Sequence, residues 1–215
     1  MRWQTILVTI SVVIVLTGCV GGAGGVPGTL EYELPTTLTV PVGQALPGTD
    51  ILYTAHGADG AHLLIAGQPA LKRVGDTVQW SGEQVPGAQV TLKLRVAHIS
   101  AESIRLVGSA DLVLHNTQPV RGAPNSAASL HYAGPVAYRV RRGDVLPGTT
   151  FSYLGPSEQG ALLGGIDEYP YRRMGDSIYW EGTLNEHASL HLDVRVVQYG
   201  DRTMRVAGTA TIWLY

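Results

Sequence analysis

The chain carries few residues whose types and spacing could do chemistry, and the nearest to a site is a histidine–aspartate pair. His191 and Asp193 alternate with apolar residues in the run LHLDVRV, and this period-two spacing places both side chains on one face of a strand. An imidazole and a carboxylate can each bind a metal ion, but zinc takes three or four ligands in a tetrahedral array. One strand rarely supplies such a set, so we expect no metal site and no cofactor.

The sequence also lacks the short motifs that accompany catalysis. It contains no Gly-x-Ser-x-Gly turn, no phosphate-binding loop and no His-Glu-x-x-His motif. Acidic residues are plentiful, but none has a recognisable catalytic setting. We therefore expect no catalytic residues and a non-catalytic protein, with an enzyme of unknown type as an alternative.

The one cysteine follows an apolar N-terminal segment. Residues 5–16 form an uncharged apolar run, which has the length of a signal-peptide core and is shorter than the roughly 20 residues that span a bilayer. The sequence Leu16-Thr17-Gly18-Cys19 comes next. It resembles the lipobox of bacterial lipoproteins. The resemblance implies cleavage between Gly18 and Cys19, and attachment of a diacylglyceryl group to the Cys19 thiol.

Lipidation at Cys19 would define where the protein resides. We expect a chain anchored in a membrane through the lipid on Cys19, on the extracytoplasmic side of the cell envelope, with inner and outer membrane both left open. Residues 19–27 are rich in glycine after the cysteine and predict a flexible tether. The alternatives are an uncleaved N-terminal helix or a signal peptide whose cysteine is incidental.

The remainder of the chain repeats itself at an offset of 100 positions. Leu46-Pro47-Gly48-Thr49 recurs as Leu146-Pro147-Gly148-Thr149, and many single landmarks recur in the same register. We interpret this as a tandem duplication. The predicted parts are a signal peptide at 1–18, a lipidated cysteine and tether at 19–27, a first β domain at 28–115, a linker at 116–128 and a second β domain at 129–215.

Alternating hydrophobicity dominates both copies. Val90, Leu92, Leu94 and Val96 alternate with polar residues, as in a half-buried strand. Turn-forming pairs such as Pro-Gly and Gly-Asp separate the runs, and no helical period is seen outside the signal peptide. We expect an all-β fold with roughly seven or eight strands per copy, arranged as an antiparallel β-sandwich or a small β-barrel.

The last two strands of each copy predict a long hairpin, which in the first copy pairs residues 88–98 with 102–114. Keeping the apolar residues of both strands on one face requires paired residue numbers with an even sum. A two-residue turn would give an odd sum, so we expect a three- or five-residue turn or a bulge. Arg95 and Arg105 then share the outer face.

The two copies differ most in their aromatic residues and arginines. Trp80, Trp180, Tyr53 and Tyr153 are in phase with their apolar neighbours and predict core positions. The second copy has many more tyrosines and arginines than the first, and several of its extra aromatic residues are out of phase with the core.

Tyrosine, tryptophan and arginine dominate interface hot spots. We therefore predict a binding surface in the second copy, formed by Tyr179, Trp213, Arg195 and Arg205. The alternative is that this face packs on the first copy, or that Trp213 only anchors the C-terminus.

Charge narrows the range of partners. The formal net charge of −2 argues against nucleic-acid binding. Our first hypothesis is a non-catalytic envelope protein that displays its β domains for protein–protein or assembly contacts. The second is a glycan- or small-molecule-binding module that uses the exposed aromatic residues of the second copy.

Overall fold

A computed structural model describes residues 28–123, 128 and 130–215. These residues form antiparallel sheets joined by turns, which confirms the all-β prediction with sandwich-like packing. No helix in these ranges is long and apolar enough to cross a membrane. The predicted signal peptide, Cys19 and the tether lie outside the described residues.

The first half of the molecule contains seven strands. They are β1 (Leu30–Pro41), β2 (Ile51–Gly57), β3 (Gly60–Ile65), β4 (Gln68–Lys72), β5 (Thr77–Val85), β6 (Ala88–Ile99) and β7 (Ser103–Leu114). The long strands form a four-stranded sheet in the order β1-β7-β6-β5, and the short strands form a three-stranded sheet in the order β2-β3-β4.

The second half has the same order of strands and one addition. Its strands are β9 (Leu130–Arg141), β10 (Ser152–Ser157), β11 (Gly160–Gly164), β12 (Tyr171–Arg172), β13 (Ser177–Asn185), β14 (Ala188–Tyr199) and β15 (Thr203–Leu214). The addition is β8 (Val120–Arg121), which lies within the stretch predicted as a linker. It pairs with β13, so the large sheet has five strands in the order β8-β13-β14-β15-β9.

The predicted hairpin is β6–β7 in the first half and β14–β15 in the second. Leu92 pairs with Ala110 and Leu192 with Ala210, so the paired numbers have even sums as predicted. A bulge between Val196 and Gln198 changes the register before the turn, and the first half has the same bulge between Val96 and His98. Of the expected alternatives, a three- or five-residue turn or a bulge, the structure has the bulge, and Arg95 and Arg105 share the outer face as predicted.

The even-numbered side chains of the long strands form the buried inner face of each large sheet. Tyr53 and Tyr153 are fully buried, as predicted for core residues. Each donates its hydroxyl to a backbone carbonyl of the neighbouring hairpin turn, at Ser100 and Gly200 respectively. These bonds fasten each three-stranded sheet to its own large sheet.

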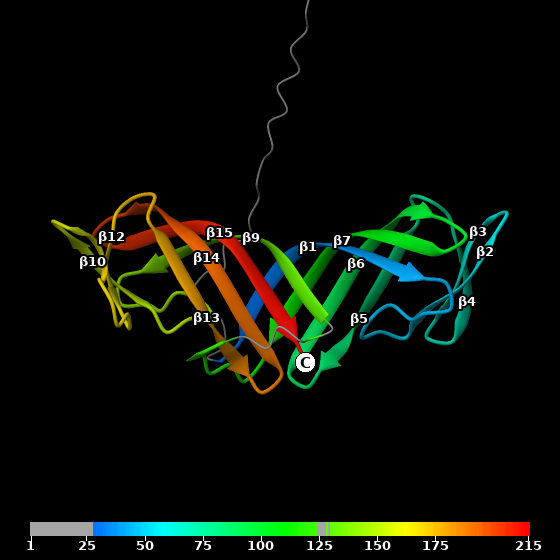
Figure 1. The fold of residues 1–215 in the computed structure, drawn as a ribbon, viewed down its shortest axis with the longest axis horizontal. Coiled ribbons are helices and arrows are strands. Elements are labelled where there is room, and N and C mark those ends of the chain that lie inside the picture. Colours follow the sequence, from blue (N-terminus) through cyan, green and yellow to red (C-terminus); the bar gives the residue numbers. More distant parts are fainter. Residues whose placement is uncertain (1–27, 124–127, 129) are drawn as a thin grey trace, which may run out of the picture.

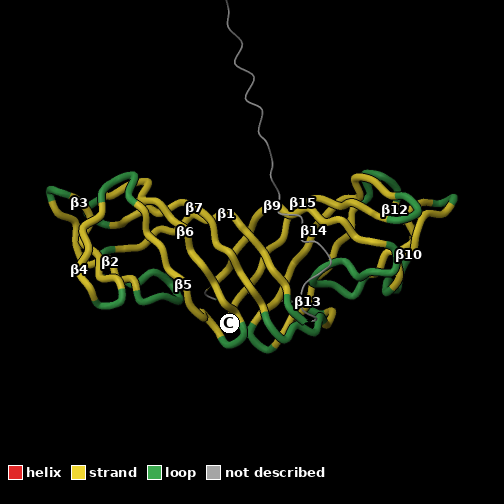
Figure 2. The backbone as a smooth tube through the Cα atoms, turned by 180° about the vertical axis from the view of Figure 1, so that it is seen from behind, coloured by secondary structure: helices red, strands yellow, loops and turns green. Residues whose placement is uncertain are grey.

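The two large sheets meet in the middle of the molecule, and the three-stranded sheets lie at its far ends (Figures 1 and 2). Strands β1 and β9 contact each other at this junction. A Cβ at Gly134 would overlap Leu34 and Pro35, so glycine permits the close approach of the two strands. The halves therefore pack on one another, a point that the sequence left open.

Reciprocal contacts extend the junction. The Leu130 side chain reaches Gly48 in the first half, and the Leu30 side chain reaches Gly148 in the second. The Tyr132 hydroxyl also donates a hydrogen bond to the Gln84 side chain at 2.8 Å. Equivalent segments of the two halves thus make reciprocal contacts across the junction. The buried residues of both halves form one apolar cluster.

Candidate binding face

The odd-numbered side chains of β13, β14 and β15 point away from the core and form the outer face of the second half. Three rings cross this face from strand to strand, and we call Tyr179, His191 and Trp213 the aromatic row. The Tyr179 and His191 rings meet edge to face with centroids 4.9 Å apart, and His191 lies 6.3 Å from Trp213. These distances lie in the range of favourable aromatic pairs.

Glu181 fixes the centre of the aromatic row. Its carboxylate lies 2.9 Å from Nδ1 of His191, its register partner on β14. A hydrogen bond to Glu181, with burial and the negative charges of Glu181 and Asp193, raises the pKa of Tyr179 to about 12. The tyrosine therefore remains a neutral hydrogen-bond donor at physiological pH.

The structure brings two of the predicted site residues to one end of this face. Tyr179 is 48% exposed, so it is not covered by the first half, and that alternative is wrong for this residue. Arg195 pairs with Ser177 on β13, which is two residues before Tyr179 and therefore on the same face of the sheet. Its guanidinium donates to the Gly175 carbonyl at 3.1 Å, which holds the arginine against the sheet.

The other two predicted residues stand at opposite ends of β15. Trp213 is partly exposed and pairs with Ser189 and His131. Arg205 is eight residues away along the strand, or roughly 26 Å at about 3.3 Å per residue. The four predicted residues therefore do not form one patch, although all lie on the outer face.

Arg205 belongs to a separate basic group near the β14–β15 turn. It pairs directly with Arg139 on β9, and both line a shallow hollow together with Arg202. Within the described part of the chain, none of these three arginines forms an ion pair. Like charges directly opposite each other on a sheet are destabilising, and the acidic residue Asp201 lines the same hollow.

Sequence reasoning missed Glu181, and it considered His191 only as half of a metal pair. The signal was available, because both residues are in odd-numbered outward positions of predicted strands. What it could not supply was the register between β13 and β14, which places Glu181 opposite His191. Within the described ranges, no group of three or more His, Cys, Asp or Glu residues could hold a metal ion.

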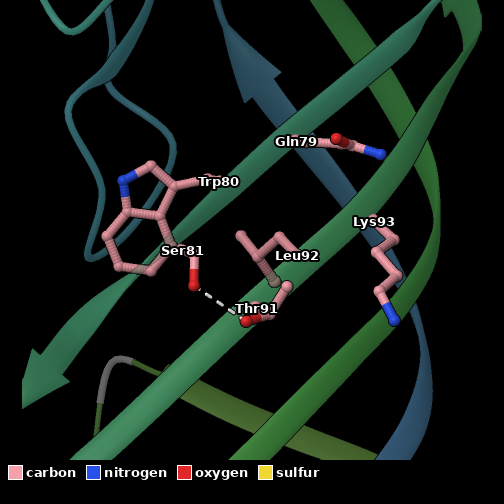
Figure 3. A pocket seen from close by; sticks show the side chains of 6 residues that line it. All are labelled: Gln79, Trp80, Ser81, Thr91, Leu92 and Lys93. Atoms are coloured by element: carbon pink, nitrogen blue, oxygen red, sulfur yellow. Dashed lines mark hydrogen bonds between the residues drawn. The ribbon is translucent and has the colours of Figure 1, made fainter.

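The same region of the first half is a shallow hollow that both polar and apolar side chains line. Gln79, Ser81, Thr91 and Lys93 line a shallow hollow with Trp80 and Leu92 (Figure 3). The Ser81 and Thr91 hydroxyls share a hydrogen bond at 2.8 Å, and Lys93 pairs with Asp111. Gln79 and Thr91 have the positions of Tyr179 and His191, so this hollow lies where two rings of the aromatic row stand in the second half.

Comparisons with known proteins identify no relative. No protein-family model matches the chain, and searches of curated proteins and of solved structures also found no match. Function must therefore be argued from the two faces themselves.

Proposed function

We propose that the protein is a non-catalytic, lipid-anchored component of the cell envelope, whose second β domain binds a protein partner through its outer face. The aromatic row carries the proposal. It joins three strands in one partly exposed surface, and two of its three residues, Tyr179 and Trp213, are of types that dominate interface hot spots.

The shape of this surface favours a protein over a glycan or a small molecule. Small ligands bind in concave sites that bury most of their surface. Neither of the two hollows described above is lined by Tyr179, His191 or Trp213. A surface that lies outside both hollows, with an arginine at its margin, suits the broad contact of a protein interface.

The lipid anchor is supported by the resemblance of Leu16-Thr17-Gly18-Cys19 to a lipobox. Mass spectrometry of the mature protein should find acylated Cys19 as the first residue. The Cys19→Ala variant should lose the lipid and leave the membrane fraction. A wild-type chain that retains residues 1–18, or that carries an unmodified thiol, would reject the anchor without affecting the test of the outer face.

Photo-crosslinking in intact envelopes tests the outer face. Thr209 is exposed on β15 and pairs with Asp193, the register partner of Tyr179; Ser109 is the equivalent residue on β7. We expect a photoreactive amino acid at position 209 to give a protein adduct of defined mass, and the same group at position 109 to give none.

A face-exchange variant shows whether the adduct depends on the aromatic row. Tyr179→Gln, His191→Thr and Trp213→Val together install the residue types of the first half. We expect the adduct at position 209 to fall at least tenfold, because hot-spot residues each contribute more than about 1.4 kcal/mol. The matched control, Gln79→Ala with Thr91→Ala, should leave it unchanged. An adduct that survives the exchange, or that oligosaccharides abolish by competition, would refute a protein partner on this face.

A further inference from the structure

Three arginines of the second half converge on the shallow hollow beside the β14–β15 turn. Arg139 comes from β9, Arg205 from β15 and Arg202 from the turn itself. Arg205 lies directly opposite Arg139 on one side and opposite Gln198 on the other. Directly paired residues on neighbouring strands have Cβ atoms about 5 Å apart. Two arginine side chains therefore stand side by side on one face of the sheet, with the third at its end.

These three guanidiniums have no partner within the described part of the chain. Neither a hydrogen bond nor an ion pair engages any of them there. Several arginines elsewhere each donate to a backbone carbonyl: Arg73, Arg95, Arg142, Arg172, Arg173 and Arg195. The N–H donors of the three arginines at the hollow are therefore available to a ligand.

The first half has the same turn without this cluster. Arg105 lies opposite Thr39 and His98, so the row that contains two arginines in the second half contains one in the first. Glu102 has the position of Arg202. The fold does not require the two additional arginines, because the first half forms the same strands and turn with threonine and glutamate.

The backbone under the hollow is held in place from the core. The fully buried Tyr153 donates its hydroxyl to the Gly200 carbonyl at 2.7 Å. Across the turn, Gly200 N donates to Thr203 O at 3.0 Å, and Arg142 N donates to Arg202 O at 2.9 Å from just beyond β9. The three arginines thus project from a fixed frame, so a ligand loses little affinity to the ordering of the turn.

The charge of the hollow defines the chemistry of its ligand. Three arginines and one aspartate, Asp201, line it among uncharged residues, which leaves a formal charge of +2. A phosphate monoester carries roughly −1.5 to −2 at neutral pH and has three acceptor oxygens. Guanidinium forks bind such oxygens in pairs, and arginine stays protonated at physiological pH. One phosphate group would neutralise the hollow, whereas a carboxylate would neutralise half of its charge.

We propose that this hollow binds a phosphate monoester group between Arg139, Arg202 and Arg205. Gln198 and Thr203 line the same hollow and supply an amide and a hydroxyl as further donors. A bound phosphate relieves the repulsion between the paired arginines, so binding stabilises the folded protein. The site does not depend on the partner proposed for the aromatic row, because no residue of that row lines the hollow.

Titration with inorganic phosphate, followed by NMR of the arginine side-chain N–H groups, tests the site. At constant ionic strength we expect saturable shifts at Arg139, Arg202 and Arg205, and none at Arg105, the equivalent of Arg205 in the first half. Arg139→Gln with Arg205→Gln should raise the dissociation constant at least tenfold, because each charge-assisted hydrogen bond contributes about that factor.

A charge-matched control separates a site from general screening. Arg73→Gln with Arg173→Gln removes the same charge from two exposed arginines outside the hollow and should leave the dissociation constant unchanged. Shifts that never saturate, an equal response of Arg105, or an equal loss of affinity in the control would overturn the site. Each of these results would show that phosphate acts only as a counterion.

The folding equilibrium gives a second readout. Phosphate at ten times its dissociation constant should raise the folded-to-unfolded ratio of the wild type about elevenfold. Without phosphate, Arg139→Gln with Arg205→Gln should be at least as stable as the wild type, because the like-charge pair is gone; with phosphate it should be less stable. A gain of the same size in both proteins would contradict the proposal.

Vesicles distinguish a soluble phosphate ester from a lipid headgroup. The Cys19→Ala chain is used so that no attached lipid contributes. If the ligand is a headgroup, this chain should bind phosphatidylcholine vesicles that contain phosphatidic acid but not vesicles of phosphatidylcholine alone, and Arg139→Gln with Arg205→Gln should abolish the binding. Saturable phosphate binding without vesicle binding would assign the site to a soluble phosphate ester. Failure of both probes to bind would refute the site.

Discussion

At equivalent positions, the two large sheets keep the same inner face and present different outer faces. Both halves bury the apolar residues of their long hairpin and a tyrosine on their second strand. On the outside, the first half has a hydroxyl pair and a lysine–aspartate ion pair, whereas the second has the aromatic row. Because period-two strands separate the two faces, the outer one can change without disturbing the core.

The edges of the two sheets differ as well, and this difference is energetic. Trp180 is covered by β8 and fully buried, while Trp80 lies at an open edge and donates to the exposed Asp50 carboxylate. The same residue in the same fold position is thus solvated to different degrees. The comparison teaches that the burial of a side chain on one strand depends on a segment far from that strand in sequence.

The largest expected effect comes from removing these tryptophans. Trp180→Ala should lower the free energy of unfolding by about 3–5 kcal/mol, as for other fully buried tryptophans. Trp80→Ala should cost roughly 1–2 kcal/mol less, because part of its ring is already in water. Equilibrium denaturation in urea measures both changes.

The sizes of these losses also test whether Trp80, at the edge of β5, is less buried than Trp180. Trp180→Phe and Trp80→Phe serve as milder variants if either alanine variant does not fold. Equal losses for the two tryptophans would contradict the difference in burial.

A smaller effect is expected from two equivalent tyrosines at the junction. The Tyr132 hydroxyl donates to Gln84, whereas the buried Tyr32 hydroxyl has no well-formed hydrogen bond within the described part of the chain. Tyr132→Phe should therefore cost about 1 kcal/mol, and Tyr32→Phe should cost less or be neutral. Urea denaturation of the two single variants checks the order. A larger loss for Tyr32→Phe would show that its hydroxyl has a partner in solution.

The contact of β8 with the rest of the second half gives a still smaller effect. Arg121 lies over the Phe151 ring at 5.7 Å and pairs with the exposed Asp167 at 3.6 Å. Such exposed interactions contribute below about 1 kcal/mol each. Arg121→Ala should lower the free energy of unfolding by less than about 1 kcal/mol, and Asp167→Ala by still less. High salt should remove the part due to the ion pair, and a loss that salt leaves intact would assign it to the ring contact.

Much of the fold could be predicted from the sequence because the information is local. Alternation along Val90 to Val96 gives the strand and its buried face, and the even-sum rule excludes a regular two-residue turn and leaves the bulge among three alternatives. Trp180 and Tyr153 were assigned to the core by phase alone. Trp80, assigned to the core by the same argument, is only partly buried. The alternation of apolar and polar residues shows which face of a strand a side chain lies on, but not what covers the edge of the sheet.

The site was less predictable because it depends on neighbours that are distant in sequence. Phase placed Tyr179 and Trp213 outside, but only the strand registers show that His191 and Glu181 join them and that Arg205 does not. The contact of β1 with β9 and the pairing of β8 were likewise invisible, because no periodic pattern marks either. Residues 120–121 appear as a linker in sequence and act as a strand only because β13 offers them an edge.

The finest distinction between the two outer faces is the titration of one phenol. Glu181 raises the pKa of Tyr179 to about 12, so Glu181→Gln should lower it toward the ordinary value of about 10 with almost no change in stability at neutral pH. Between those two pH values the folded state keeps a proton that the unfolded state releases. Stability should therefore fall as pH rises through this window, and fall less in Glu181→Gln.

The first half supplies a matched control for that titration. Gln79→Tyr places a phenol at the equivalent position, beside Ser81 and Lys93 instead of Glu181 and Asp193. A nearby cation favours the phenolate, so this tyrosine should titrate below Tyr179. NMR of ring-labelled tyrosine, assigned with Tyr179→Phe, follows each group separately. Identical pKa values at the two positions would show that the carboxylates do not govern the phenol, and that the outer faces differ in shape but not in electrostatics.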